Sequence, residues 1–140
     1  MEKNIIVEDY CSFEVSKLLK EKGFDGLCRR YDFEDWQGRH TDTSTILPSN
    51  FNKHGGNTSI PTLQMAMKWL REVHKLHVEI YRSYDYGTDA DNRLVAEWWC
   101  WSYKIVNIET ASLIYIPNDD FDTHEEAVEA ALKYSLENLI

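Results

Sequence analysis

A chain of 140 residues fits one ordinary domain, and folding at that size buries about two thirds of the surface that the unfolded chain exposes. Fifteen lysines and arginines against twenty-four aspartates and glutamates give a formal net charge of -9, which disfavours direct binding to DNA, RNA or anionic membrane surfaces. Aromatic residues make up 13% of the chain, a high share that is expected to dominate the core or an interface.

The three cysteines indicate a reducing compartment. Cys11, Cys28 and Cys100 are odd in number and lack both CxxC spacing and the density of a secreted disulfide scaffold. The first ten residues, MEKNIIVEDY, have only three consecutive apolar residues before Glu8 and Asp9, too few for the apolar region of a signal peptide. No apolar run approaches the roughly 20 residues that span a bilayer. The sequence therefore predicts a cytoplasmic protein that does not bind membranes.

The first predicted element is a short helix over residues 12–22. Ser12 suits its N-cap and Gly23 its C-cap. The apolar stripe between them consists of Phe13, Val15, Leu18 and Leu19. Residues 26–33, GLCRRYDF, are a strand candidate in which two adjacent arginines interrupt the alternation.

A long polar loop is predicted at about residues 32–61. Glycines and prolines separate isolated apolar residues there, and no helical or strand period is visible. Such a stretch is a functional loop, a partly disordered segment, or a segment with an unrecognised strand around residues 43–47. The last two outcomes are the more common ones.

The clearest helix begins near Thr62, an N-cap residue after Pro61, and continues through TLQMAMKWLREVHK. Its i, i+3, i+4, i+7 pattern predicts a buried face of Leu63, Ala66, Met67, Leu70, Val73 and His74. The next segment, LHVEIYRSY, has the alternation of a half-buried strand. One face of that strand carries Val78, Ile80, Arg82 and Tyr84, and the other carries His77, Glu79, Tyr81 and Ser83.

The turn-rich segment YDYGTDADN leads to a second strand at about residues 93–108, which is rich in β-formers. One face of this strand carries Val95, Glu97, Trp99, Trp101, Tyr103 and Ile105. The other carries Leu94, Ala96, Trp98, Cys100, Ser102 and Lys104. Both faces are too apolar for simple alternation. A third strand is predicted at about residues 111–116, before Pro117.

The last predicted helix follows the acidic loop NDDFD, where Thr123 and Glu126 have the spacing of a capping box. Its buried stripe comprises Val128, Ala131, Leu132, Ser135, Leu136 and Leu139. The order of elements indicates an α+β fold in a single domain, residues 1–140. We expect a three-stranded antiparallel meander with two to three helices packed on one face.

Three segments with helical packing patterns together hold 47 of the 140 residues, namely IPTLQMAMKWLREVHKLHVEI, SKLLKEKGF and HEEAVEAALKYSLENLI. These segments resemble short uncharacterised proteins of Bacteroides-type gut bacteria, their prophages and phages. The matching residues carry packing information rather than a catalytic motif. The resemblance implies an origin in a phage or mobile element, and it implies no activity and no functional residue.

The most unusual local feature is the aromatic run WWCWSY at residues 98–103. Because side chains alternate along a strand, three tryptophans within four positions place large rings on both faces of the sheet. One face meets the helices, and the other meets a partner or is covered by the long loop. The candidate partner or ligand surface consists of Tyr81, Trp98, Trp99, Trp101 and Tyr103.

Metal sites, paired carboxylates and catalytic motifs give weaker indications of function than the aromatic run does. His74 and His77 lack a Cys or acidic ligand at supporting spacing, so no metal site is predicted. Glu79 and Glu97 would have to face each other across the hairpin to act as a general acid and base. No nucleophile elbow, P-loop or dinucleotide fingerprint occurs. The sequence therefore favours a protein that is not an enzyme, and it predicts no catalytic residue and no cofactor.

An acidic run precedes and opens the last helix. Its members are Asp119, Asp120, Asp122, Glu125, Glu126 and Glu129. Acidic residues at a helix N-terminus complement the helix dipole. The alternative is a charge pattern that imitates a DNA backbone and occupies a nucleic-acid-binding protein. The spacing does not match a calcium loop.

The leading hypothesis is a non-enzymatic accessory protein of a phage or mobile element. It would bind a protein partner, or a second copy of itself, through the aromatic surface, the long loop, or both. One alternative is a protein that sequesters a nucleotide-like small molecule, with Tyr81, Trp99 and Trp101 stacking on its base. The other alternative is the acidic DNA mimic.

Overall fold

The computed structural model describes residues 6–140, so the first five residues of the segment considered above as a signal peptide lie outside the described part. The helices are α1 (Phe13–Glu21), α2 (Leu63–His74) and α3 (His124–Asn138). One antiparallel sheet contains β1 (Cys28–Glu34), β2 (His40–Ser49) and β3 (Asn57–Ser59) in the order β2-β1-β3. The other contains β4 (Leu76–Thr88), β5 (Leu94–Asn107) and β6 (Ser112–Tyr115) in the order β4-β5-β6.

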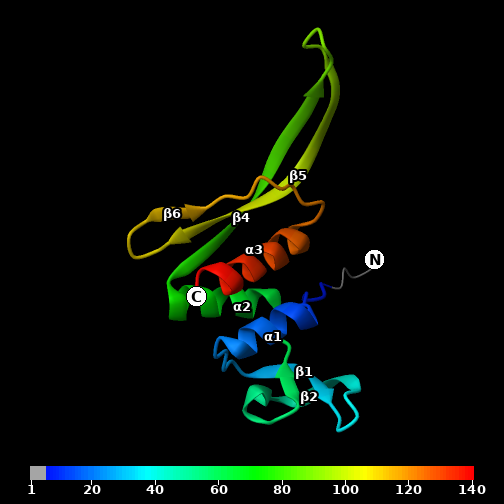
Figure 1. Cartoon of the computed structure of the whole chain (residues 1–140), viewed down its shortest axis with the longest axis vertical. Coiled ribbons are helices and arrows are strands. Elements are labelled where there is room, and N and C mark those ends of the chain that lie inside the picture. Colours follow the sequence, from blue (N-terminus) through cyan, green and yellow to red (C-terminus); the bar gives the residue numbers. More distant parts are fainter. Residues whose placement is uncertain (1–5) are drawn as a thin grey trace, which may run out of the picture.

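The three helices lie between the two sheets (Figure 1). The α+β class predicted from the sequence is confirmed. The expectation of a single meander with helices on one face is not confirmed, because a second three-stranded sheet lies on the far side of the helices. The order β4-β5-β6 does follow the predicted succession of three antiparallel strands.

The predicted N-caps of the first two helices are confirmed. The side chain of Ser12 accepts a hydrogen bond from the backbone N–H of Val15, and that of Thr62 accepts one from Met65. At the other end of α2, Lys75 adopts a left-handed conformation with φ 58°. This residue turns the chain, so that β4 begins at the next position.

The capping box of α3 is present in a shifted form. The Thr123 side chain accepts a hydrogen bond from the Glu126 N–H, as predicted. The Glu126 carboxylate, however, accepts one from the N–H of Asp122 and not from that of Thr123. Each bond satisfies a backbone donor near the start of the helix, where no intrahelical partner exists.

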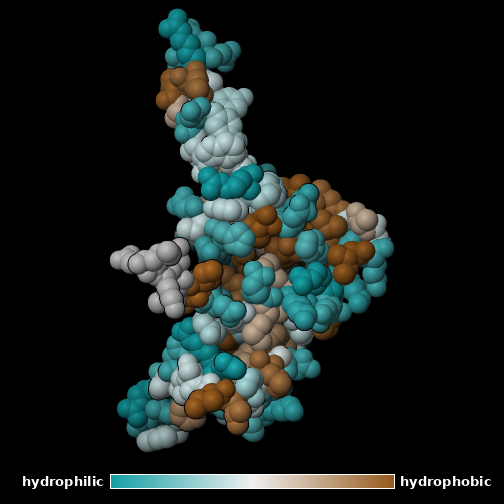
Figure 2. Space-filling view, turned by 180° about the vertical axis from the view of Figure 1, so that it is seen from behind, coloured by the Kyte–Doolittle hydropathy of each residue, from teal (hydrophilic) through white to brown (hydrophobic). Residues whose placement is uncertain are grey.

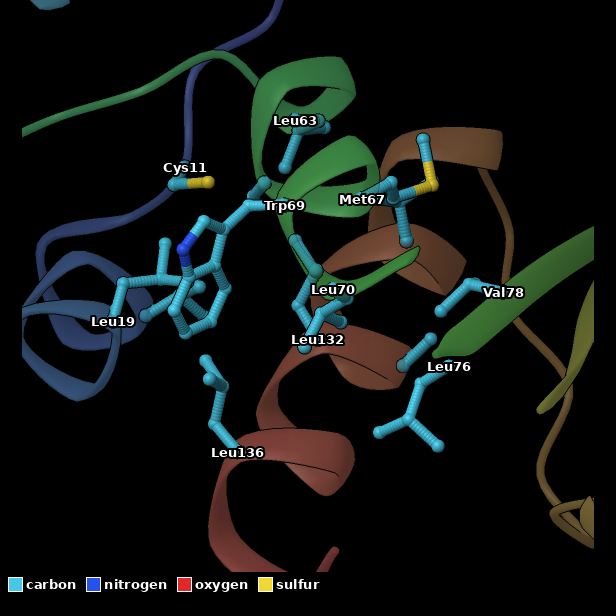
Figure 3. Packing of buried hydrophobic residues seen from close by; sticks show 14 of the residues in the cluster. Cys11, Leu19, Leu63, Met67, Trp69, Leu70, Leu76, Val78, Leu132 and Leu136 are labelled. Atoms are coloured by element: carbon cyan, nitrogen blue, oxygen red, sulfur yellow. The ribbon is translucent and has the colours of Figure 1, made fainter. Parts of the chain in front are cut away.

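The helices and the inner part of β4 and β5 enclose one hydrophobic core (Figure 3). Figure 3 shows the indole of Trp69 pointing from α2 toward Leu19 of α1, with Leu132 and Leu136 of α3 beside it. Phe24 makes an edge-to-face contact with Trp69, with 5.6 Å between ring centroids. Trp69 therefore links α1 and α2, although the sequence pattern did not place it on the buried face.

The predicted burial of Val73 is wrong. It lies in the last turn of α2 and is 55% exposed, because the neighbouring elements do not cover that side of the turn. His74, in the same turn, is half-buried and packs edge-on against Trp69, with 4.7 Å between ring centroids. Burial lowers the pKa of His74 below its ordinary value.

The predicted long loop at residues 32–61 is also wrong over most of its length. It contains the end of β1, all of β2 and β3, and a short 3-10 helix, Phe51–Lys53. The strand candidate at residues 26–33 corresponds to β1, and the unrecognised strand considered at residues 43–47 lies within β2. β2 is exposed along most of its length, so backbone pairing with β1 forms the strand without an alternating apolar pattern.

All three cysteine thiols are free and buried. Burial raises the pKa of the Cys11 thiol well above its ordinary value and that of Cys28 to about 11. We expect iodoacetamide at pH 8 to modify none of the three in the folded protein and all three in urea, as counted by intact-protein mass spectrometry. Labelling of the native protein faster than its unfolding would contradict the described burial.

Candidate functional site

The β4–β5 hairpin extends beyond the rest of its sheet and away from the body of the molecule (Figures 1 and 2). β4 has 13 residues and β5 has 14, whereas β6 pairs only with the inner end of β5, Ile105–Asn107. We call residues 82–101 the arm. The arm begins at the pair Arg82 and Trp101 and includes the turn between the strands.

The turn at the end of the arm is held by Asp89. Its carboxylate accepts hydrogen bonds from the backbone N–H groups of Asp91 and Arg93, at 2.9 and 3.0 Å. Asn92 adopts the left-handed conformation that asparagine tolerates. Next to the turn, Leu94 and Val95 are exposed, and Figure 2 shows a hydrophobic patch near the end of the arm.

Strand register decides which arm residues share a face. Tyr84 lies opposite Trp99, and Arg82 lies opposite Trp101. The Arg82 guanidinium lies 5.8 Å from the Trp99 ring centroid and 5.1 Å from that of Trp101. Tyr84 lies 5.2 Å from Trp99 and 6.2 Å from Tyr86, between ring centroids. We call these five residues the aromatic ladder.

Exposure increases along β5 from the body toward the end of the arm. Tyr103, two residues from the arm on the body side, is 3% exposed and packs between Tyr115 and Phe121, and burial raises its pKa to about 12. Trp101 is half-buried and packs edge-on against His124 at the start of α3, with 5.1 Å between ring centroids. Trp99 is 63% exposed. Of the predicted surface residues on this face, Tyr103 is therefore a core residue and Trp99 a surface residue.

The predicted surface is divided between two faces. Tyr81 lies opposite Ser102, and Trp98 lies opposite Asp85, so both belong to the face away from the ladder. Trp98 is exposed and Tyr81 half-buried. A single planar ligand therefore cannot stack on Tyr81 and on Trp99 together.

The two glutamates considered as a catalytic pair do not meet. Glu79 lies opposite Lys104, with 3.3 Å between the Glu79 carboxylate and the Lys104 ammonium group. Glu97 lies on the other face and accepts a hydrogen bond of 2.6 Å from the hydroxyl of Tyr84. That hydrogen bond raises the pKa of Tyr84, because it stabilises the protonated phenol. Glu97 thus fixes the orientation of one ring of the ladder.

Part of the acidic run is used for internal contacts. Glu129 accepts hydrogen bonds from both the backbone N–H and the hydroxyl of Ser12, at 2.6 and 2.9 Å. Glu126 accepts one from the backbone of Asp122. These carboxylates connect α3 to the start of α1 and cap α3, so the run is not a continuous free acidic stripe.

Metal binding has no geometric support in residues 6–140. Within that range no group of three or more His, Cys, Asp or Glu side chains is placed to hold a metal ion. His74 is in contact with Trp69, and His77 lies at the start of β4. The buried Nε2 of His74 and Nδ1 of His77 have no hydrogen-bond partner among the described residues.

A contact between a half-exposed histidine and a largely buried aspartate, which the sequence pattern did not reveal, lies in the β1–β2 sheet. The Nδ1 of His40 is 2.7 Å from the carboxylate of Asp32, and Phe13 packs edge-on against the imidazole. His40 lines a cavity of about 500 Å³ between α1 and this sheet. The other lining residues are Phe13, Lys17, Lys20, Glu21, Glu34 and Thr58. Two lysines and two glutamates give this lining no excess of either charge.

The hydrogen bond from His40 to Asp32 raises the pKa of His40 above its ordinary value. A raised histidine pKa stabilises the folded state below about pH 6.5, and this stabilisation is lost as the pH rises through the folded-state pKa. Glu34 raises the pKa further, whereas Lys17 lowers it. We expect Asp32→Asn to lower the titration midpoint of His40, measured by NMR of the ring protons. Asp42→Asn, which breaks the neighbouring Arg30 ion pair, is the control that leaves the midpoint unchanged.

Comparison with known proteins finds no match to this chain among protein-family models, curated proteins or solved structures. Nothing in these comparisons tests the resemblance to proteins of gut bacteria and their phages. Among residues 6–140, no helix is long and apolar enough to cross a membrane.

Proposed function

We propose that this chain is a non-enzymatic binding protein that docks on a protein partner through the aromatic ladder of its arm. The observation that carries the proposal is a projecting hairpin with large, exposed aromatic side chains, of which Trp99 is 63% exposed and Tyr86 59%. Trp, Tyr and Arg are the residues that most often dominate the binding energy of protein interfaces. Contiguous exposed aromatic surface of this kind marks interaction sites in soluble proteins.

The form of the ladder suits a macromolecule better than a small ligand. Ligand sites are concave and bury most of the ligand. The cavities of about 210 to 500 Å³ in the body have linings without any ladder residue. The contacts among Arg82, Trp99 and Tyr84 also hold the rings in place before binding, which lowers the entropy lost on association.

The charge of the arm indicates which charge the rim of the partner surface should carry. Residues 82–101 contain two arginines and four carboxylates, a net charge of -2, within a chain of -9. The carboxylates of Asp85, Asp89 and Asp91 lie toward the end of the arm. A partner with a basic rim around an apolar centre complements this distribution and associates faster at low ionic strength.

The proposal is tested with a ring-deletion variant and a matched control. Partners are captured from the source cells with the wild-type chain, identified by mass spectrometry, purified, and titrated against each variant. We expect Trp99→Ala to weaken the measured affinity at least about 30-fold, which corresponds to about 2 kcal/mol, as for interface hot spots. The control is Trp36→Ala, which removes the same side chain from an 89% exposed position outside the arm. Equal affinities of the two variants would refute the proposal.

The two alternative functions predicted from the sequence have less support. The nucleotide-like ligand was expected to stack on residues that lie on opposite faces of the arm. The DNA mimic requires free carboxylates, and Glu126 and Glu129 are engaged in contacts within the chain. An origin in a phage or mobile element stays a prediction, and the proposed binding function does not depend on it.

A further inference from the structure

The backbone of β4 has hydrogen-bonding groups that point away from the sheet. Trp101 of β5 exchanges two backbone hydrogen bonds with Phe121, at 2.8 and 2.9 Å, on the side of β5 opposite to β4. In antiparallel strands, pairs that exchange hydrogen bonds alternate with pairs that do not. Because both backbone groups of Trp101 bond to Phe121, the pair of Arg82 and Trp101 does not exchange hydrogen bonds. The N–H and C=O groups of Arg82, and by alternation those of Ile80 and Tyr84, point to the outer edge of β4.

This outer edge is unpaired in the described part of the chain, because β4 is the first strand of the order β4-β5-β6. Beyond the body the arm is a two-stranded ribbon, an arrangement that is only marginally stable in water. A long edge with unpaired groups is a template for another strand unless it is blocked. Toward the end of the arm one donor is blocked, since the Asp85 carboxylate accepts the N–H of Tyr86. The open part of the edge thus lies at Ile80, Arg82 and Tyr84.

The charges along the hairpin identify the strand that fits this edge. The inner segments, residues 75–82 and 101–107, contain Lys75, Arg82 and Lys104 against one carboxylate, a net charge of +2. The outer segment, residues 83–100, contains one arginine against four carboxylates, a net charge of -3. Two hairpins side by side in opposite directions would place each negative outer segment along a positive inner segment. This self-complementarity favours a second copy of the same chain.

We propose that β4 of a second copy pairs antiparallel with β4 along this edge, with Ser83 opposite Ser83 of the second copy. In this register Arg82 lies opposite Tyr84 of the second copy, and Ile80 lies opposite Tyr86. The outward N–H and C=O groups of Arg82 and Tyr84 in each β4 meet those of the other, as the alternation requires. At the pair of Ile80 and Tyr86 only the N–H of Ile80 and the C=O of Tyr86 meet, because the N–H of Tyr86 stays with the Asp85 carboxylate. Extending the register brings His77 toward Asp89 of the second copy.

Neighbouring registers are less favourable. The outward groups of the two β4 strands face each other only in registers that differ by a whole-residue movement of the two-fold axis. The neighbouring registers therefore have the axis at Arg82 or at Tyr84. An axis at Arg82 places the two copies of Arg82 against each other and Glu79 opposite Asp85. An axis at Tyr84 places Glu79 opposite Asp89. Like charges directly opposite each other destabilise strand pairing, so the register centred on Ser83 is preferred.

This inference rests on the proposed function, in which the arm is an interaction element. It adds the outer edge of β4 to the aromatic ladder as a second contact surface of the arm. Pairing occurs in the plane of the sheet, so the aromatic ladders of both copies remain uncovered. The two-fold axis is perpendicular to the sheet in such an arrangement, which places both ladders on the same side. The dimer thus presents a four-stranded ribbon with twice the aromatic surface to the partner.

The hydrogen bonds of the edge are tested with a pair of variants at one position. Tyr84→Ala and Tyr84→Pro both remove the ring, but only proline removes the outward N–H, and proline is tolerated where that group faces away from the neighbouring strand. We expect light scattering at about 100 μM to show dimers for the wild type and for Tyr84→Ala, and monomers for Tyr84→Pro. Circular dichroism checks that the variants are folded. A monomeric wild type, or a dimeric Tyr84→Pro, would overturn the inference.

The register is tested by cross-linking, which does not depend on the proline variant. Ser83→Cys in a Cys100→Ser background places two thiols at the two-fold axis, and the second change is needed because Cys100 lies opposite Ser83 within the hairpin. Residues opposite each other in a pair without hydrogen bonds have Cα atoms about 4.5 Å apart, a distance that a disulfide spans. We expect a disulfide-linked dimer under mild oxidation. The control is Thr88→Cys in the same background, where the two thiols would be about 34 Å apart.

Failure of this inference and failure of the proposed function have different signatures. Equal cross-linking of Ser83→Cys and Thr88→Cys, with partner affinity still dependent on Trp99, refutes the dimer and leaves the proposed function standing. Selective cross-linking at Ser83, with partner affinity independent of Trp99, supports the dimer and refutes docking through the ladder.

Discussion

Replacing Leu70 by alanine is expected to lower the free energy of unfolding by about 3 kcal/mol, within the range measured for fully buried leucines. Leu70 is 0% exposed and lies in α2 at the centre of the core, close to Leu132 of α3 (Figure 3). The truncated side chain leaves a cavity that the rigid helices around it fill only in part. The change is measured as the shift of the midpoint in urea, followed by circular dichroism at an unchanged m-value.

The matched control is Val73→Ala, one turn further along the same helix. The sequence pattern alone assigns both residues to the buried face, whereas the structure leaves Val73 largely exposed. We therefore expect Val73→Ala to change the free energy of unfolding by no more than about 0.5 kcal/mol. Similar losses for the two variants would show that the last turn of α2 is covered and that the described packing is wrong.

Shortening the arm is expected to abolish partner binding while the body stays folded. The variant replaces residues 84–99 by Asn-Gly, so that Ser83 and Cys100 flank a two-residue turn. This pair neighbours the pair of Arg82 and Trp101 and so exchanges backbone hydrogen bonds, which is the closing pair that such a turn requires. Trp101 keeps its backbone pairing with Phe121.

The expected result follows from where the contacts of the arm lie. From this hairpin the core cluster takes Leu76, Val78, Tyr103 and Ile105 and no residue between 84 and 99. We expect the affinity for the captured partner to fall at least about 100-fold, which corresponds to about 2.8 kcal/mol, and the thermal midpoint of the body to change by only a few degrees. Retained affinity would place the partner site on the body. Loss of the folded body would show that the arm contributes to its stability.

The helices were predictable because the signals that define them are local. Ser12, Thr62 and Thr123 are caps that act within three residues, and each begins the helix that the sequence indicates. The residues of α2 that pack inward were predicted less well. Trp69 was missed and Val73 was wrongly assigned, since burial depends on which neighbours cover each turn and not only on the helical period.

The candidate site was predictable in composition and not in arrangement. The aromatic run at residues 98–103 was recognisable, and alternation already separated Trp98 from Trp99 and Trp101. The partners of these rings depend on the register between β4 and β5. Arg82 and Tyr84 complete the ladder, whereas Tyr81 lies on the other face. A shift of one residue would exchange those roles, and the sequence of either strand does not specify the register.

By itself the sequence determined the α+β class, the helix starts, the succession β4-β5-β6 and the concentration of aromatic rings, because caps, periods and alternation act over a few residues. Only the tertiary structure decided that residues 32–61 contain most of a second sheet, that Tyr103 is core and Trp99 surface, and that the hairpin leaves the body as an arm. Those features depend on contacts between segments far apart in the chain. Examples are the two backbone hydrogen bonds between Trp101 and Phe121 and the ring contact between His40 and Phe13. No local pattern encodes them.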